Sequence, residues 1–167
     1  MKKLAVIAAA VLVQVSVFAA DDPVAEFEGF LQSAQKATDS QEMVYLNHYN
    51  QKWAKRKFST TDVKYDVKKT DSLVNPIVGV VSMNLRTEQT DLFPTKEEAQ
   101  SATVFEPRFT NTYRISLNYS HRTGKWALSK GSYESMRNRA TFEVTEEGIK
   151  KEPMAVPTAA LLNWLPK

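Results

Sequence analysis

The feature that most constrains the fold is a stretch of alternating side chains that runs from Arg108 to His121. Nearly every second residue is apolar or aromatic, and the residues between them are polar or charged. A period of two is typical of a β-strand that buries one face and exposes the other. The residues that share the apolar side are Phe109, Tyr113, Ile115, Leu117, Tyr119 and His121. The stretch therefore predicts a half-buried strand.

The residues that follow predict a tight turn and a return strand. Arg122-Thr123-Gly124-Lys125 contains a glycine that can adopt positive φ, and Trp126 begins a second apolar run. A loop with an even number of residues places Trp126 opposite His121, on the apolar face. A three-residue loop would place it opposite Ser120, on the polar face. We therefore predict the even loop.

The return strand predicts a bulge. Without one, Lys130 would lie opposite Leu117 on the apolar face. A bulge at Lys130-Gly131 places Gly131 opposite Leu117 and Tyr133 opposite Ile115 instead, and a glycine inside a strand often marks such a position. Because a bulge bends the strands around it, we expect a curved sheet.

The rest of the chain predicts helices before this hairpin and strands on both sides of it. Asp22-Pro23 has the pattern of an N-cap followed by proline, and apolar residues then recur at helical spacing over 24–34. Residues 43–58 fit a helix or a strand, and we favour a helix as far as Lys55. Further strands are predicted over 63–67, 77–85 and 140–144, and short helices over 95–101 and 158–165.

One or two helices and four or five mostly antiparallel strands form an α+β pattern, in which the N-terminal helix lies on the concave face of the curved sheet. In this layout, and in the turn at Thr123-Gly124-Lys125-Trp126, the chain resembles cystatin-like and nuclear-transport-factor-2-like domains. The segment from Lys64 to Pro76 is similar to segments of uncharacterised exported bacterial proteins. The resemblance implies a fold and no activity, because this fold holds enzymes and binding modules alike.

The first twenty residues have the pattern of a secretory signal peptide. Met1-Lys2-Lys3 is basic, residues 4–13 are apolar, and small residues close the segment at Ala19-Ala20. A membrane anchor is the alternative, but Gln14 and Ser16 leave an apolar run shorter than the ~20 residues that a span needs. We therefore predict cleavage after either alanine.

Cleavage would leave residues 21–167 as a single domain, which we expect to be periplasmic or secreted and without a stable membrane span. Without Lys2 and Lys3, 20 basic residues nearly balance 19 acidic ones. This balance gives no argument for a nucleic-acid partner, and we expect none outside the cytoplasm. The chain has no cysteine, which excludes disulfides, a thiol nucleophile and zinc–thiolate sites.

Candidate catalytic residues are few. Neither of the two histidines has the spacing of a metal site, so we expect no metal and no cofactor. His121 fits a hydrogen-bonded histidine at the rim of the hairpin, which we favour, or a catalytic base. Asp71 is the other candidate base. A triad of Ser72, His121 and Asp71 lacks the Gly-x-Ser-x-Gly elbow and is disfavoured.

Two polar regions are candidates for ligand binding. Thr70-Asp71-Ser72 fits a ligand-binding loop or a turn in which Asp71 and Ser72 hydrogen-bond the backbone, and we favour the turn. The hairpin carries Arg114, Arg122 and Lys125, which fit an anionic envelope polymer or lipid head groups if they share a sheet face. The alternative is a solvated face balanced by acidic residues of the first helix, which we favour.

These observations favour a non-catalytic exported module that binds a partner protein or an anionic envelope component. One alternative is a small hydrolase or isomerase with its pocket between helix and sheet, using Asp71, His121 or a tyrosine. Another is a soluble accessory subunit of an envelope complex, joined through the apolar tail at residues 158–165. For that tail we expect burial, with Leu161 and Trp164 packed onto the domain, because burial removes apolar area from water.

Overall fold

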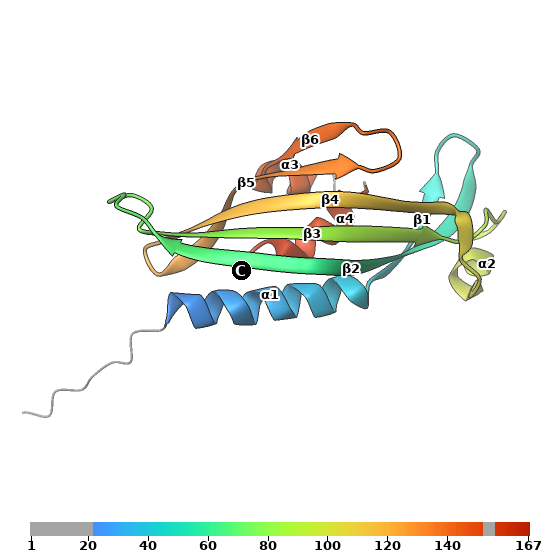
Figure 1. Cartoon of the computed structure of the whole chain (residues 1–167). Helices are drawn as coiled ribbons and strands as arrows, with labels where there is room; N and C mark the ends of the chain where they lie inside the picture. Colours follow the sequence, from blue (N-terminus) through green and yellow to red (C-terminus); the bar gives the residue numbers. More distant parts are fainter. Residues whose placement is uncertain (1–21, 152–155) are drawn as a thin grey trace, which may run out of the picture.

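The structure is a computed structural model that describes residues 22–151 and 156–167. Its framework is one antiparallel sheet in which six strands follow each other in chain order (Figure 1). This confirms an α+β class with a curved antiparallel sheet, although the sheet has six strands rather than four or five. The strands are β1 (Glu42–Asn47), β2 (Lys52–Lys69), β3 (Ile77–Gln89), β4 (Glu106–Arg122), β5 (Lys125–Ser135) and β6 (Thr141–Val144). The predicted signal peptide lies outside the described residues.

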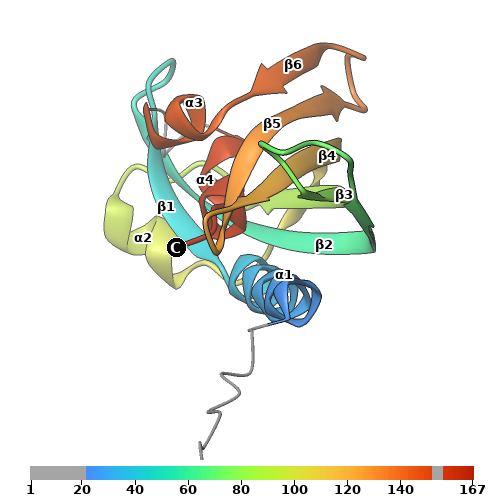
Figure 2. The ribbon, with the colours of Figure 1, turned by 90° about the vertical axis from the view of Figure 1, so that its left-hand side faces the viewer.

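The first helix is the longest, and the others are short. The first helix lies on the concave side of the sheet, together with the helices near the C-terminus (Figure 2). Among the described residues, no helix is long and apolar enough to cross a membrane. The helices are α1 (Pro23–Asp39), α2 (Lys96–Ser101), α3 (Glu146–Lys151) and α4 (Thr158–Leu161), followed by the 3₁₀ helix η1 (Leu162–Trp164). Of these, α3 was not predicted.

The predicted hairpin register is confirmed. Trp126 lies opposite His121, and the loop between the strands is the two residues Thr123 and Gly124. Both loop residues have positive φ, 47° and 77°, which is the geometry of a type I′ turn. This turn twists in the same direction as the strands, so it fixes the register without strain.

The bulge is present but lies slightly earlier than predicted. Gly131 is opposite Leu117, as expected. Lys130 is opposite Asn118 and Leu128 is opposite Tyr119, so the unpaired residue is Ser129. This arrangement keeps the lysine on the polar face of the sheet. The hydroxyl of Ser129 also donates a hydrogen bond to the hydroxyl of Ser120 at 3.0 Å.

The prediction of a helix as far as Lys55 is wrong, because this segment forms β1, a turn and the start of β2. Tyr45 pairs with Ala54, and Leu46 pairs with Trp53. In the turn, the side chain of Asn47 accepts a hydrogen bond from the backbone of Tyr49 at 3.0 Å. The apolar spacing of this segment also fits a helix, but pairing with the sheet decides its structure. Because β2 pairs with β3, its other edge is open to β1, which pairs there as a further strand.

Helix α1 is fixed to the sheet by a cap and an apolar stripe. The carboxylate of Asp22 accepts a hydrogen bond from the backbone of Val24 at 3.0 Å, and proline follows the cap as predicted. Phe27 is fully buried on the stripe. A Cβ added at Gly79 of β3 would lie 2.6 Å from the Phe27 ring, so this glycine allows the helix to approach the sheet closely.

The C-terminal tail completes the core, as predicted. Leu161 and Trp164 are both 0% exposed. The indole of Trp164 donates a hydrogen bond to the hydroxyl of Thr38 in α1 at 3.0 Å, and its carbonyl accepts one from the buried Tyr119 hydroxyl at 2.7 Å. The tail therefore connects α1 to the centre of the sheet.

Candidate functional site

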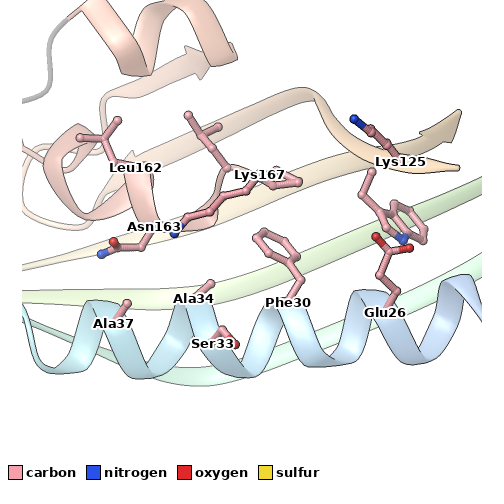
Figure 3. A pocket seen from close by; sticks show the side chains of 12 residues that line it. Glu26, Phe30, Ser33, Ala34, Ala37, Lys125, Leu162, Asn163 and Lys167 are labelled. Atoms are coloured by element: carbon pink, nitrogen blue, oxygen red, sulfur yellow. The ribbon is translucent and has the colours of Figure 1, made fainter. Parts of the chain in front are cut away.

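A cavity of about 450 Å³ lies between α1, the start of β5 and the segment that follows η1 (Figure 3). This volume is within the range of small-molecule sites. Its floor comes from a second face of α1, beside the stripe that contacts the sheet, where Phe30, Ala34 and Ala37 recur at helical spacing. The small side chains of the two alanines leave the space that the cavity occupies.

The opposite wall of the cavity is also mainly apolar. Its side chains come from the hairpin and from the C-terminal segment, which the buried Trp164 holds in place. Trp126 is fixed by a hydrogen bond from its indole nitrogen to the carbonyl of Pro23 at 3.0 Å. The wall residues are Trp126, Leu162, Leu165 and Pro166, with Asn163 between them. The cavity is therefore a groove with two rigid walls, which we call the α1 groove.

The rim of the α1 groove carries charge of both signs. Glu26 lies at one end of the groove, and Lys125 lies above the same end (Figure 3). Lys125 is exposed, and none of the ion pairs within the described part of the chain includes it. The Lys167 side chain also lines the groove. The lysine side chains thus offer cationic groups near an apolar cavity.

His121, the predicted rim histidine, lies just beyond the groove. Its Nε2 is 3.8 Å from a carboxylate oxygen of Glu26, and its ring packs against Trp126 with 5.2 Å between ring centroids. The separation from Glu26 is longer than a hydrogen bond, so the two groups interact by charge when the imidazole is protonated. A second cavity, lined by Asp22, Glu26, His121 and Gly124, borders them.

Among the described residues, no serine or threonine hydroxyl forms a hydrogen bond with this histidine. Ser33 lines the α1 groove, but it lies seven residues from Glu26 along α1, or about 10 Å. Its hydroxyl donates a hydrogen bond to the carbonyl of Gly29 at 2.9 Å. Within residues 22–151 and 156–167, no group of acidic or histidine side chains is arranged to hold a metal ion.

The candidate loop at Thr70, Asp71 and Ser72 is not part of the groove. The Ser72 hydroxyl accepts hydrogen bonds from the backbone nitrogens of Val74 and Asn75, at 3.3 and 3.1 Å, and the Thr70 hydroxyl donates to the carbonyl of Asn75. Two of the three residues therefore serve the turn itself. No hydrogen bond or ion pair in the described part of the chain joins Asp71 or Ser72 to the histidine, so the structure does not assemble a triad.

The three basic candidates of the hairpin do not form one site. Arg114 makes an ion pair of 3.2 Å with Glu134, and the Arg122 side chain donates to that of Asn75. The two arginines lie eight residues apart on β4, about 26 Å along the strand. Only Lys125 borders the α1 groove.

The residues that form the groove floor were not predicted as functional. Phe30, Ala34 and Ala37 have a spacing of four and three residues, which indicates an apolar helix face. That signal is present in the sequence, but it does not show which apolar faces of a helix remain uncovered. Comparison of the chain with protein-family models, curated proteins and solved structures finds no match. The function therefore has to be inferred from the geometry alone.

Proposed function

We propose that this chain is an exported binding module, and that its α1 groove holds a small ligand with an apolar body and an acidic group. The observation that carries the proposal is the α1 groove itself, a cavity with apolar walls and lysine side chains at its rim. Ligand sites are typically mostly apolar, with a few polar groups that orient the ligand. The expected ligand class is therefore an anionic amphiphile, which is one form of anionic envelope component.

The orientation of the ligand follows from the charges at the rim. Glu26 faces His121, whereas Lys125 has no acidic partner within the described residues. An acidic group near Lys125 would gain a charge interaction there, and the apolar body would cover Phe30, which is half-buried. Charge and apolar contact thus favour the same orientation.

Export is part of the proposal and rests on the basic start and apolar run of residues 1–20. Mass spectrometry of protein recovered from the producing cells should show a mature N-terminus at Ala20 or Asp21. Recovery of the intact N-terminal segment in a membrane fraction would contradict cleavage.

Ligand binding is tested with decanoate and decanol, which share an apolar chain and differ in charge. Calorimetric titration with each probe measures occupancy. Ala37→Trp should fill the exposed floor of the groove and abolish binding, while Gln32→Trp, also exposed on α1 but outside the groove, should not. Lys125→Gln should weaken decanoate several-fold and leave decanol unchanged.

Two results would overturn the assignment. One is the absence of saturable binding of either probe to the wild-type protein. The other is equal binding by the wild type and Ala37→Trp while Gln32→Trp retains its fold. Circular dichroism of both variants separates a blocked groove from a misfolded helix.

A hydrolase is the second candidate, and the pair of His121 and Glu26 at the end of the groove is the observation that favours it. Ester hydrolysis by the purified protein that is lost in His121→Gln would support this candidate over simple binding. The tail does not favour an accessory subunit, because Leu161 and Trp164 are buried and are not available to a partner.

A further inference from the structure

A half-buried arginine lies on the concave face of the sheet, outside the lining of the α1 groove. It is Arg56 of β2, which pairs with Gln89 of β3. The nearer end of the α1 groove is at Asn163, whose side chain donates to that of Gln41 at 2.8 Å, and Gln41 is two residues before Met43, which pairs with Arg56. Arg56 itself does not line the groove.

Arg56 is a half-buried cation without a carboxylate partner. None of the ion pairs within residues 22–151 and 156–167 includes it. Burial lowers the pKa of its guanidinium, and the groups that act against this are the phenols of Tyr45 and Tyr113 rather than an acid. Removing a charge from water without a counter-charge is unfavourable, so an anion at this position would stabilise the arrangement.

The guanidinium is held in a fixed orientation. Its plane stacks on the ring of Tyr45, with 4.2 Å from the guanidinium carbon to the ring centroid. One terminal nitrogen donates to the Tyr45 hydroxyl at 2.8 Å and to the amide oxygen of Gln89 at 3.1 Å. Tyr45 in turn donates to the same amide oxygen of Gln89. These contacts hold the guanidinium in position before a ligand binds.

Donors remain for a ligand. The described residues provide no hydrogen-bond acceptor for Nε or for the other terminal nitrogen of Arg56. Tyr113 is half-buried on the neighbouring part of the face, and its hydroxyl has no hydrogen-bond partner in the same part of the chain. A planar carboxylate matches the fork of a guanidinium, and a phenol can donate to the same group.

Aromatic surface continues beside these donors. The Tyr113 ring packs edge to face against Tyr133 at 5.9 Å, and Tyr133 stacks on Phe142 at 5.0 Å. Phe142, on the short edge strand β6, is 47% exposed. A ring attached to the carboxylate would find an apolar, aromatic partner there.

We propose that Arg56 and Tyr113 bind the carboxylate of an aromatic acid, whose ring lies against Tyr133 and Phe142. The proposal is independent of the α1 groove, since none of these four residues lines it. A free aromatic acid and the C-terminal aromatic residue of a peptide share this chemistry.

Calorimetric titration of the protein with benzoate and with benzamide tests the charge requirement. Benzoate should bind and benzamide, its neutral analogue of similar shape, should not. Arg56→Gln should abolish benzoate binding. Arg56→Lys, which keeps the charge and loses the fork, should weaken it at least about tenfold, the usual effect of losing a charge-assisted hydrogen bond. Tighter binding of N-acetylphenylalanine than of benzoate would indicate a peptide terminus as the source of the acid.

Matched variants separate this site from the other cations. Lys130→Gln removes an exposed cation from the polar face of the sheet and should leave benzoate affinity unchanged, while Tyr113→Phe should reduce it several-fold. Equal binding of benzoate and benzamide, binding of inorganic phosphate without benzoate, or full binding by Arg56→Gln would overturn the proposal. If Arg56→Gln does not fold, unchanged benzoate affinity in Tyr113→Phe overturns it instead.

Discussion

Replacement of Trp164 by alanine is expected to lower the free energy of unfolding by about 4–5 kcal/mol. The side chain is 0% exposed and is the largest of the fully buried ones. Its indole nitrogen donates to the hydroxyl of Thr38, which is itself fully buried, at 3.0 Å. The substitution therefore removes a large apolar group and one buried hydrogen bond that joins the tail to α1.

The magnitude follows from these two losses. Large aromatic side chains replaced by alanine in a core typically cost about 3–5 kcal/mol, and the lost hydrogen bond, worth about 1 kcal/mol, places this substitution in the upper part of that range. The contribution of the lost hydrogen bond is small because Asn163 also donates to the Thr38 hydroxyl at 3.4 Å, so the hydroxyl oxygen keeps a partner in the variant. For a domain of this size the total corresponds to a melting temperature roughly 10–15 °C lower.

Urea denaturation followed by circular dichroism measures the change, provided that the slope of the transition stays constant between variants. Trp164→Phe retains a ring and should cost only about 1–2 kcal/mol, because the hydrogen bond and part of the volume are lost. Tyr49→Ala is the matched control, since Tyr49 is fully exposed at the β1–β2 turn and its replacement should change stability by less than about 0.5 kcal/mol.

A loss below about 1 kcal/mol in Trp164→Ala would refute the reasoning, because it would mean that the tail does not contribute to the core. A double-mutant cycle with Thr38→Val tests the hydrogen bond alone. It should give a coupling of about 1 kcal/mol, and additive effects would show that the two side chains do not interact.

Four further substitutions test the packing of the sheet and of α1. Trp126→Ala should destabilise by about 3–5 kcal/mol in urea, and a change under about 1 kcal/mol would contradict the burial of this hairpin residue. Gly79→Ala should cost about 1–3 kcal/mol, because its Cβ would lie 2.6 Å from the Phe27 ring. Gly29→Ala, with nothing within 4 Å of its Cβ, should stabilise α1 by about 0.5–1 kcal/mol. Similar effects of the two changes would argue against the close approach of Phe27 to Gly79. Burial raises the pKa of Tyr119 above its usual value near 10, so the unfolded state ionises first and stability should fall above about pH 10 by up to 1.4 kcal/mol per pH unit. Tyr119→Phe should show a shallower decline in urea titrations between pH 8 and 11, and an unchanged slope would show that this phenol is not the cause.

The sequence predicts the central hairpin down to its register. Alternation fixes which side chains share a face. Only a loop with an even number of residues places Trp126 opposite His121, on the apolar face, so the alternation also predicts the even loop found at Thr123-Gly124. The helix caps are equally local. Asp22 and Thr95 each hydrogen-bond backbone nitrogens within three residues, as their sequence context predicts.

The segment from Met43 to Lys55 shows where local information ends. Its apolar spacing fits a helix, but its backbone hydrogen bonds are made to residues of β2 and, through Trp53, to Phe93. A strand gains its hydrogen bonds only from a partner, so its stability depends on residues that no local window contains. The count of six strands rather than four or five follows from the same dependence.

For both candidate sites, the sequence shows which residues are present and only the tertiary structure shows their surroundings. The apolar stripe of Phe30, Ala34 and Ala37 is readable from spacing, but only the packed structure shows that the C-terminal segment leaves part of it open. Arg56 belongs to a basic run, in which it looks like any solvated cation. The pairing of three strands half-buries it beside Tyr45 without an ion pair among the described residues, because charge environment is set by neighbours in space rather than along the chain.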